Sequence, residues 1–337
     1  MNTVIPASRT GVVMRVLGAL LALYAIVVLA LMWWWDAEPD PFDVVKVAQE
    51  HAAAHGHRVV PGTMTTTTLM RTIDVLLDKR GGYLANDVAP PGVLMDNVPN
   101  WEKGVVLQMR DLAQAMRNDF ARSQTQSVED ADLREAFNYL SYKHNRWLLP
   151  SSESQYRNAN ERVEAYLTRL GDTDDENAQF YARADNLVAY LDLVNKRLGS
   201  ISQRLSASVG QLRINTDLAG DASAQQSTPG PESRVVKTPW LEIDDVFYEA
   251  RGSTWALMHF LKAIEHDFEP VLRDKNALIS LRQVIRELEE SQRPLGSPII
   301  LNGSQFGFFA NHSLVMANYV SRANAAVLDL RQLLKQG

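Results

Sequence analysis

Three histidines in the segment HAAAHGH are the side chains best suited to binding a metal ion. His51 and His55 are four residues apart, so on a helix their imidazoles lie on one face, and His57 follows Gly56, where the chain can turn back. No second motif nearby supplies a fourth ligand with recognisable spacing. A solvated helix end that carries histidines is therefore the favoured interpretation, and a metal site formed by His51, His55 and His57 is the alternative.

Three carboxylates share one face of a predicted helix because their spacings are three and four: Glu242, Asp245 and Glu249. Paired carboxylates can serve as the acid and base of a glycosidase. This face lies beside an apolar seam, which favours a hydrated or interface surface over a catalytic site. The sequence has no G-x-S-x-G, S-x-x-K, H-E-x-x-H or phosphate-loop motif, so it offers no recognised nucleophile and indicates no cofactor.

Three arginines each stand among small residues near an apolar helix seam: Arg183, Arg251 and Arg322. Small neighbours allow two helices to approach closely, and a guanidinium there can pair with a carboxylate at the interface. Candidate partners are Asp185, Glu249 and Asp245. Extension of each arginine into solvent is the equally supported alternative.

Long apolar seams indicate the elements that position these side chains. Apolar or small residues recur at alternating steps of three and four along 180–212, 240–268 and 309–334. Such seams predict long helices that pack side by side at about 20°, as in helical bundles. Shorter helices are predicted over 65–78, 101–122, 129–142, 154–170 and 276–291. Period-two alternation is confined to 58–60 and 299–301, so the chain is predicted to be all-α, an elongated bundle of long antiparallel helices.

Two stretches interrupt the helical pattern. Residues 79–100 contain paired glycines and paired prolines but keep apolar side chains, which predicts an Ω-type loop packed against the body and a candidate for function. Residues 216–239 are small, polar and rich in proline and glycine, which predicts a linker or surface crossover. That linker divides an N-terminal helical region, 36–215, from a C-terminal one, 240–337.

The run from Val16 to Trp35 is uncharged and predicts a single transmembrane helix. Twenty helical residues span about 30 Å, the thickness of the hydrocarbon core of a bilayer. Arginines precede the run and acidic residues follow it, so residues 1–15 are expected in the cytoplasm and the rest in the periplasm. A cleaved signal peptide is the alternative, but such signals have shorter apolar cores and end in small residues, whereas this run ends in three tryptophans.

Composition narrows the choice of partners. The net charge is −6, and leaving out Arg9 and Arg15 makes it −8 for the part from Asp36 onward. An acidic domain is repelled by nucleic acid and by anionic lipid, so no nucleic-acid partner is expected. The absence of cysteine excludes disulfides, zinc-thiolate sites and thiol nucleophiles.

Several fragments carry a resemblance to a known family: GTMTTTTL, LLDKRGGYLANDVAPPGV, DNVPNWEKG, LPSSESQY, FYARADNL, LGSISQRLSASVG, VKTPWLEIDDVFYEARG and ANHSLVMANYVSRANAA. They resemble an uncharacterised family of proteobacterial membrane-anchored proteins, catalogued as domain of unknown function 2333. The resemblance extends from about Trp35 to the C-terminus. It implies a Gram-negative inner-membrane setting, and it implies no activity, cofactor or catalytic residue.

These features together favour a non-enzymatic role. The expected protein is a membrane-anchored periplasmic scaffold or accessory factor of the cell envelope. It would contact the lipid bilayer through Val16–Trp35, and a protein partner or a second copy of itself through its helical seams. The alternative is a peptidoglycan-related hydrolase or a metal-binding protein.

Overall fold

The computed structural model describes residues 9–56, 58–123, 128–172, 178–214, 233–297, 299–304 and 306–336. These residues form eleven α-helices and a single two-stranded sheet, which confirms the predicted all-α class. The helices are α1 Arg9–Trp35, α2 Val44–His55, α3 Thr63–Asp78, α4 Asn97–Ala115, α5 Ala131–Leu140, α6 Ser152–Gly171, α7 Ala184–Ser206, α8 Ile243–Asp267, α9 Glu269–Asp274, α10 Leu278–Glu290 and α11 His312–Lys335. The strands are β1 Gln211–Ile214 and β2 Ser233–Val236.

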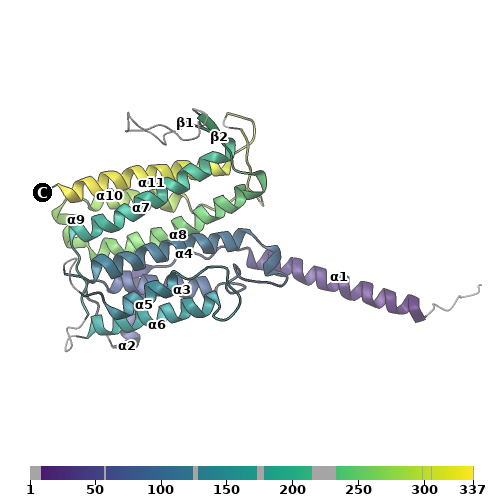
Figure 1. The fold of residues 1–337 in the computed structure, drawn as a ribbon, viewed down its shortest axis with the longest axis horizontal. Coiled ribbons are helices and arrows are strands. Elements are labelled where there is room, and N and C mark those ends of the chain that lie inside the picture. The colour runs from purple at the N-terminus through teal and green to yellow at the C-terminus, as the bar shows by residue number, and fades with distance from the viewer. Residues whose placement is uncertain are drawn as a thin grey trace, which may run out of the picture.

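The helices after α1 pack in three layers that run lengthwise (Figure 1). The pair α4 and α8 forms the middle layer, with α7, α10 and α11 on one side and α2, α3, α5 and α6 on the other. Helix α1 projects from one end of this body, here called the proximal end, and the C-terminus lies at the opposite, distal end (Figure 1). Because long helices alternate in direction, the connections 79–96, 141–151, 237–242 and 291–311 gather toward the proximal end.

The middle layer depends on two glycines. A Cβ added at Gly104 of α4 would lie 2.1 Å from the carbonyl oxygen of Glu249, and one added at Gly252 of α8 would lie 1.9 Å from that of Trp101. Both positions therefore require glycine, because the two backbones nearly touch. This close approach buries α8 along most of its length, from Phe247 to Leu261.

The threonine run of α3 is buried, and several of its hydroxyls donate to carbonyl oxygens one turn earlier in the chain. Thr66 and Thr67 donate to the carbonyl oxygens of Gly62 and Thr63, each at 2.7 Å. The backbone N–H and the side-chain hydroxyl of Thr65 both donate to Oδ2 of Asp267, each at 2.7 Å. A carboxylate at the end of α8 therefore caps the start of α3.

The predicted seams correspond to α7, α8 and α11, but the strand predictions were wrong. Residues 58–60 and 299–301 contain no strand. The observed sheet lies where the first seam was predicted to continue as helix: Gly210, with φ +84°, follows the end of α7, and β1 begins at the next residue. Of the predicted linker 216–239, residues 216–232 lie outside the described residues and 233–236 form β2. The division of the chain into two helical regions at this linker stays a prediction.

Candidate functional site: the junction between α1 and the body

Helix α1 has the properties of a membrane span. Residues Gly11–Trp35 are long and apolar enough to cross a bilayer, and only 6% of the most apolar window is buried by the rest of the protein. Trp33 and Trp34, near the end that joins the body, are exposed. Tryptophan at that position is typical of the membrane–water interface.

An ion pair fastens the segment after α1 to the central helix α8. Arg251 donates from Nε to Oε1 of Glu38 at 2.7 Å and from Nη2 to Oε2 at 2.5 Å. Its Nη1 donates to the carbonyl oxygens of Ser291 and Arg293, at 3.2 and 3.0 Å, beyond the end of α10. Arg251 is 5% exposed. All three guanidinium nitrogens are therefore used, and one side chain joins the anchor segment, α8 and the α10 end.

A histidine makes the second contact of this segment with α8. The backbone N–H of Phe42 donates to Nε2 of His259 at 3.0 Å, and the two rings stack with centroids 4.0 Å apart. Nδ1 of His259 lies 2.7 Å from the carbonyl oxygen of Trp255, so Nδ1 carries the proton and Nε2 accepts. Burial lowers the pKa of His259 to about 4, with a smaller contribution from Lys262 and against the hydrogen bond to Trp255. The imidazole is neutral at physiological pH.

The connection 79–96 lies against the end of α1. Gly81 has φ +82°, and a Cβ added there would lie 2.6 Å from the indole of Trp35. Asn97, the first residue of α4, donates to Asp36 at 3.5 Å. Glycine at position 81 is therefore required both by the backbone conformation and by the ring above it.

Glu102 of α4 holds the connection 79–96 against the body. It accepts from the backbone amides of Leu84 and Ala85, at 2.8 and 2.7 Å, and pairs with Lys79. Burial raises the pKa of Glu102, and Lys79 and the two amides oppose that rise. Tyr83 is also buried and donates to the carbonyl oxygen of His144 at 2.6 Å. The loop is packed down here, as predicted.

Part of the same loop does not pack down. Val88, Val93 and Leu94 are exposed by 50% or more, so the predicted packing against the body holds for Tyr83 and Leu84 and does not extend to these three side chains. The three residues flank the paired prolines, Pro90 and Pro91.

A profile of the family described as an uncharacterized protein conserved in bacteria, DUF2333, matches residues 8–337. The chain belongs to this family. The expected family membership is thus confirmed. The matched region includes α1 as well as the body, so the junction falls within the DUF2333 region. No curated protein and no solved structure matches the chain.

The predicted carboxylate set of this DUF2333 chain is divided among different environments. Glu249 is buried and pairs with Arg204 and with Lys103, the latter at 2.8 Å. Burial raises the pKa of Glu249, but the hydrogen bonds and charges of Arg204 and Lys103 outweigh burial and hold it below its usual value. Burial, with Asp244 and other carboxylates, raises the pKa of Asp245 to about 6, while Glu242 is exposed. Glu249 therefore holds α4, α7 and α8 together.

The histidine segment is brought together with a carboxylate. His51 and His55 stack with ring centroids 4.2 Å apart, and Nε2 of His55 lies 3.6 Å from Glu164 of α6. One potential ligand atom from each of the three lies within 4.8 Å of the others. Two imidazoles and a carboxylate form a donor set that zinc accepts. His57, the third predicted ligand, lies outside the described residues. Sequence spacing could not reveal Glu164, which lies more than a hundred positions away.

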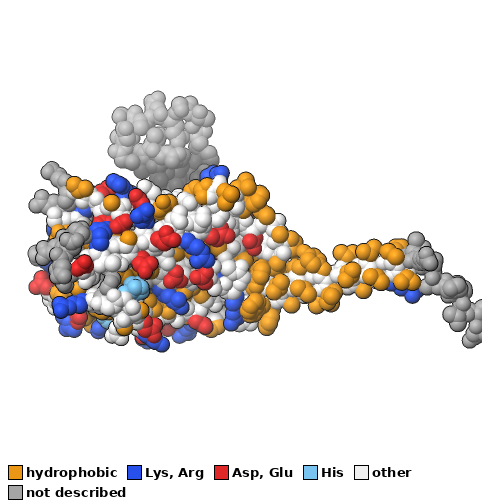
Figure 2. Space-filling view, turned by 90° about the horizontal axis from the view of Figure 1, so that it is seen from below, with side chains coloured by type: hydrophobic (Ala, Val, Ile, Leu, Met, Phe, Trp, Pro, Cys, Tyr) orange, Lys and Arg blue, Asp and Glu red, His pale blue; other side chains and the backbone are white. Residues whose placement is uncertain are grey.

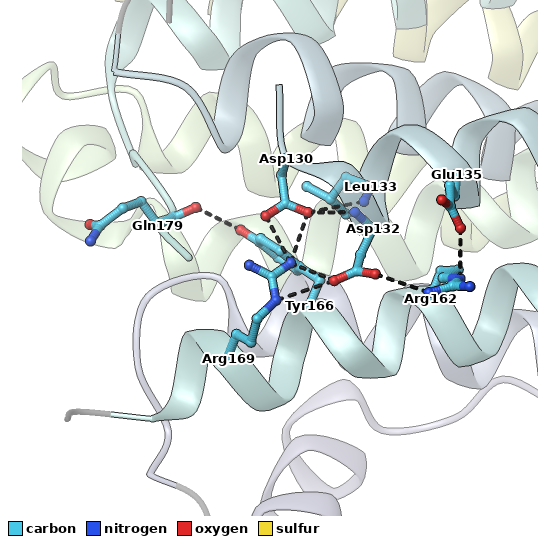
Figure 3. Close-up of polar contacts among 8 residues, drawn as sticks. All are labelled: Asp130, Asp132, Leu133, Glu135, Arg162, Tyr166, Arg169 and Gln179. Carbon is cyan, nitrogen blue, oxygen red and sulfur yellow. Dashed lines mark hydrogen bonds and ion pairs between the residues drawn. The ribbon is translucent and has the colours of Figure 1, made fainter. Parts of the chain in front are cut away.

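A second charged cluster, at the distal end, holds α5 and α6 together (Figure 3). Arg169 donates to Asp130 at 2.8 Å and to Asp132 at 2.6 Å. Asp130 also accepts from the first backbone amides of α5, and Tyr166 donates to the carbonyl oxygen of Gln179 at 2.7 Å. These carboxylates are engaged in capping and pairing, which is a structural task.

All three predicted interface arginines pair with carboxylates. Arg183 pairs with Asp185, one of the predicted partners, but this pair is exposed at the start of α7 and does not lie in a helix interface. Arg322 pairs with Glu287, at 2.6 Å, and Arg251 with Glu38. The partners of the last two were missed because they lie on other elements.

Proposed function

We propose that the protein is a single-pass, membrane-anchored scaffold or accessory factor of the bacterial cell envelope that acts through protein contacts. In this proposal α1 spans the inner membrane, with its N-terminal side in the cytoplasm and the helical body in the periplasm. The observation that carries the proposal is the junction between α1 and the body. Helix α1 projects from the body, whereas Glu38 and Phe42, in the segment that follows α1, form hydrogen bonds with Arg251 and His259 of α8.

Charge asymmetry supports this orientation. Arg9 and Arg15 lie at the N-terminal side of the apolar run and no acidic residue precedes it, whereas Asp36, Glu38 and Asp40 follow it. Positively charged flanks tend to stay in the cytoplasm.

The junction also supports a role that depends on how the body is held relative to the membrane. A buried, bidentate ion pair and a stacked, hydrogen-bonded imidazole hold the anchor segment on α8 at two points. Two separated attachment points restrict rotation of the body relative to the segment that follows α1. A protein that presents a surface at a fixed height above a membrane needs such a restriction, and a flexible tether would not supply it.

The β1–β2 ribbon is the surface that supports protein contacts. Leu212 and Val235 pair directly across the two strands and are 69% and 68% exposed. A two-stranded ribbon is marginally stable alone and presents open edges to which an extended segment of another chain can add.

Site-specific crosslinking in living cells tests the proposal. A photo-crosslinking residue placed at Val235 of the full chain should give discrete protein adducts. The same residue at Ile279, which is 72% exposed on α10 near the distal end, serves as the control and should give none. Absence of adducts at Val235, together with release of peptidoglycan fragments by the purified full chain, would contradict a scaffold and favour the hydrolase.

Metal binding is a second candidate, favoured by the convergence of His51, His55 and Glu164. The full chain purified in detergent should then contain zinc near one equivalent, and the double variant His51→Ala, His55→Ala should lose it. His266→Ala, which removes an exposed histidine of α8, is the matched control. Metal content at background in the unaltered protein would exclude this function.

A further inference from the structure

The proximal end of the body carries exposed apolar side chains on several connections. Leu94 is 58% exposed, Trp147 and Leu149 are 56% and 92% exposed, and Trp240 and Leu241 are 77% and 76% exposed. They come from three separate connections, 79–96, 141–151 and 237–242, that meet at this end. Figure 2 shows apolar side chains gathered over the end of the body next to α1, while charged side chains are prominent toward the opposite end.

Exposed apolar residues near the distal end are isolated by comparison. Val59, Val128 and Ile279 are each exposed, but they belong to three different segments, of which the last is the first turn of α10. Single exposed apolar residues are ordinary on soluble proteins, whereas a cluster with two tryptophans marks an interaction surface.

The clustered connections are joined to the end of α1 by specific contacts. Gly81 lies against Trp35, and Asn97 donates to Asp36. Within the same connection, Asn86 donates to the carbonyl oxygen of Arg146 at 3.0 Å, which places 141–151 beside 79–96. On α8, Asp245 accepts from Asn100 at 2.7 Å, which places the start of α8 beside the start of α4. The apolar connections therefore lie at the end of the body from which α1 projects.

We propose that this proximal surface is a lipid-contact surface, on which Leu94, Trp147, Leu149, Trp240 and Leu241 enter the interface of the bilayer that α1 spans. The inference rests on the proposed membrane insertion of α1 and adds a second mode of membrane contact. Exposed Trp33 and Trp34 indicate where α1 crosses the membrane–water interface. The apolar connections lie at the same, proximal end of the body. Exposed apolar side chains that include tryptophan are typical of protein surfaces that insert into the headgroup region of a bilayer.

The charges beside these residues favour a zwitterionic headgroup. Lys143 and Arg146 flank the Trp147–Leu149 segment, and Asp87 and Asp96 flank the exposed part of 79–96; all four are exposed. Basic groups match headgroup phosphate and acidic groups match headgroup ammonium, so the mixture fits a zwitterionic lipid such as phosphatidylethanolamine. A strongly anionic surface would be repelled by the acidic groups.

The absence of cysteine in the chain makes a depth measurement direct. Nitroxide labels are attached to single-cysteine variants of the full chain, Leu94→Cys, Leu149→Cys and Leu241→Cys, in phosphatidylethanolamine-containing nanodiscs. Collision of each label with oxygen, which partitions into lipid, is compared with collision with a water-soluble nickel chelate. Ile279→Cys at the distal end is the water-exposed control, and Leu23→Cys within α1 is the lipid-exposed control.

The ratio of oxygen to nickel collisions at 94, 149 and 241 should exceed that at 279 several-fold and fall below that at 23. Labels at 94, 149 and 241 that match 279, while 23 is buried in lipid, would overturn this inference and leave the anchor intact. A water-exposed label at 23 would instead overturn the membrane insertion of α1. Protection from both reagents would show that the surface is covered by protein, as by a second copy of this chain, and would likewise overturn the lipid proposal.

Discussion

At the residue scale, the attachment of the anchor segment depends on a few buried polar side chains of α8. Arg251 could be selected from the sequence because small residues flank it near a helix seam, a setting that favours a buried guanidinium. Its partner Glu38 could not, because the two are 213 positions apart and only the folded chain brings them together. His259 was missed for the same reason: no spacing pattern distinguishes a buried histidine that accepts from a distant backbone amide.

Replacement of Arg251 by alanine should destabilise the protein by about 3 kcal/mol, because it leaves Glu38 and two carbonyl oxygens without their donor in a largely buried place. Arg183→Ala is the control, since its pair with Asp185 is exposed and should contribute less than about 1 kcal/mol. Denaturant unfolding of the full chain in detergent measures both. Equal destabilisation by the two variants would show that Arg251 has no special role.

The neutral imidazole of His259 predicts loss of stability in acid. Its pKa in the folded protein, about 4, lies below the unfolded value of 6.5, so the unfolded chain binds the additional proton first. The contribution of His259 to the free energy of unfolding is therefore fully present above pH 6.5, and it is lost as the pH falls toward 4. The loss amounts to about 3 kcal/mol, from 1.36 kcal/mol per pKa unit.

The test for His259 is a comparison of pH profiles of unfolding free energy. His259→Gln keeps a polar side chain but does not titrate, so the difference between the two profiles isolates the histidine. That difference should change between pH 6.5 and 4 and be flat above pH 7. Parallel profiles across this range would contradict the buried neutral imidazole.

At the element scale, the long helices were predictable and their exact ends were not. The seams of α7, α8 and α11 repeat over several turns, so their period is unambiguous. Short elements carry little periodic signal. β1 continues the apolar seam of α7 in sequence, but the 3-10 turn 207–209 and Gly210, with its positive φ, end the helix before it, and β1 pairs with β2. Close helix approach was predicted at Gly252, one of the small residues beside Arg251, but not at Gly104, and the sequence did not indicate which helix makes the approach.

Alanine at Gly104 or Gly252 should destabilise the protein by about 3 kcal/mol, because the new methyl group would collide with a backbone oxygen that cannot move aside. Gly199→Ala in α7 is the matched control: the nearest atom to its new Cβ is the Asn324 side chain, at 3.8 Å. There alanine should stabilise the helix by about 1 kcal/mol. Thermal unfolding of the three variants gives the comparison, and a destabilisation at 199 as large as at 104 would contradict the close α4–α8 contact.

At the scale of the whole molecule, the sequence predicted an apolar helix followed by an all-helical body, and the structure has that arrangement. The three-layer order and the separation into a proximal end with apolar loops and a distal end with paired charges were not predictable, because they depend on which helices become neighbours. The predicted metal ligands were partly brought together, with Glu164 added from another helix. The sequence contains no G-x-S-x-G, S-x-x-K, H-E-x-x-H or phosphate-loop motif, so the proposed function rests on how the body is attached to α1.

The most direct test of that account is the topology of the full chain in intact cells. A single cysteine at Ile279, near the distal end, is treated with a membrane-impermeant maleimide in spheroplasts, and the membranes are then washed with alkaline carbonate. The account predicts labelling without permeabilisation and retention of the protein in the washed membranes. Labelling only after the inner membrane is opened, or release of the protein into the soluble fraction, would contradict it.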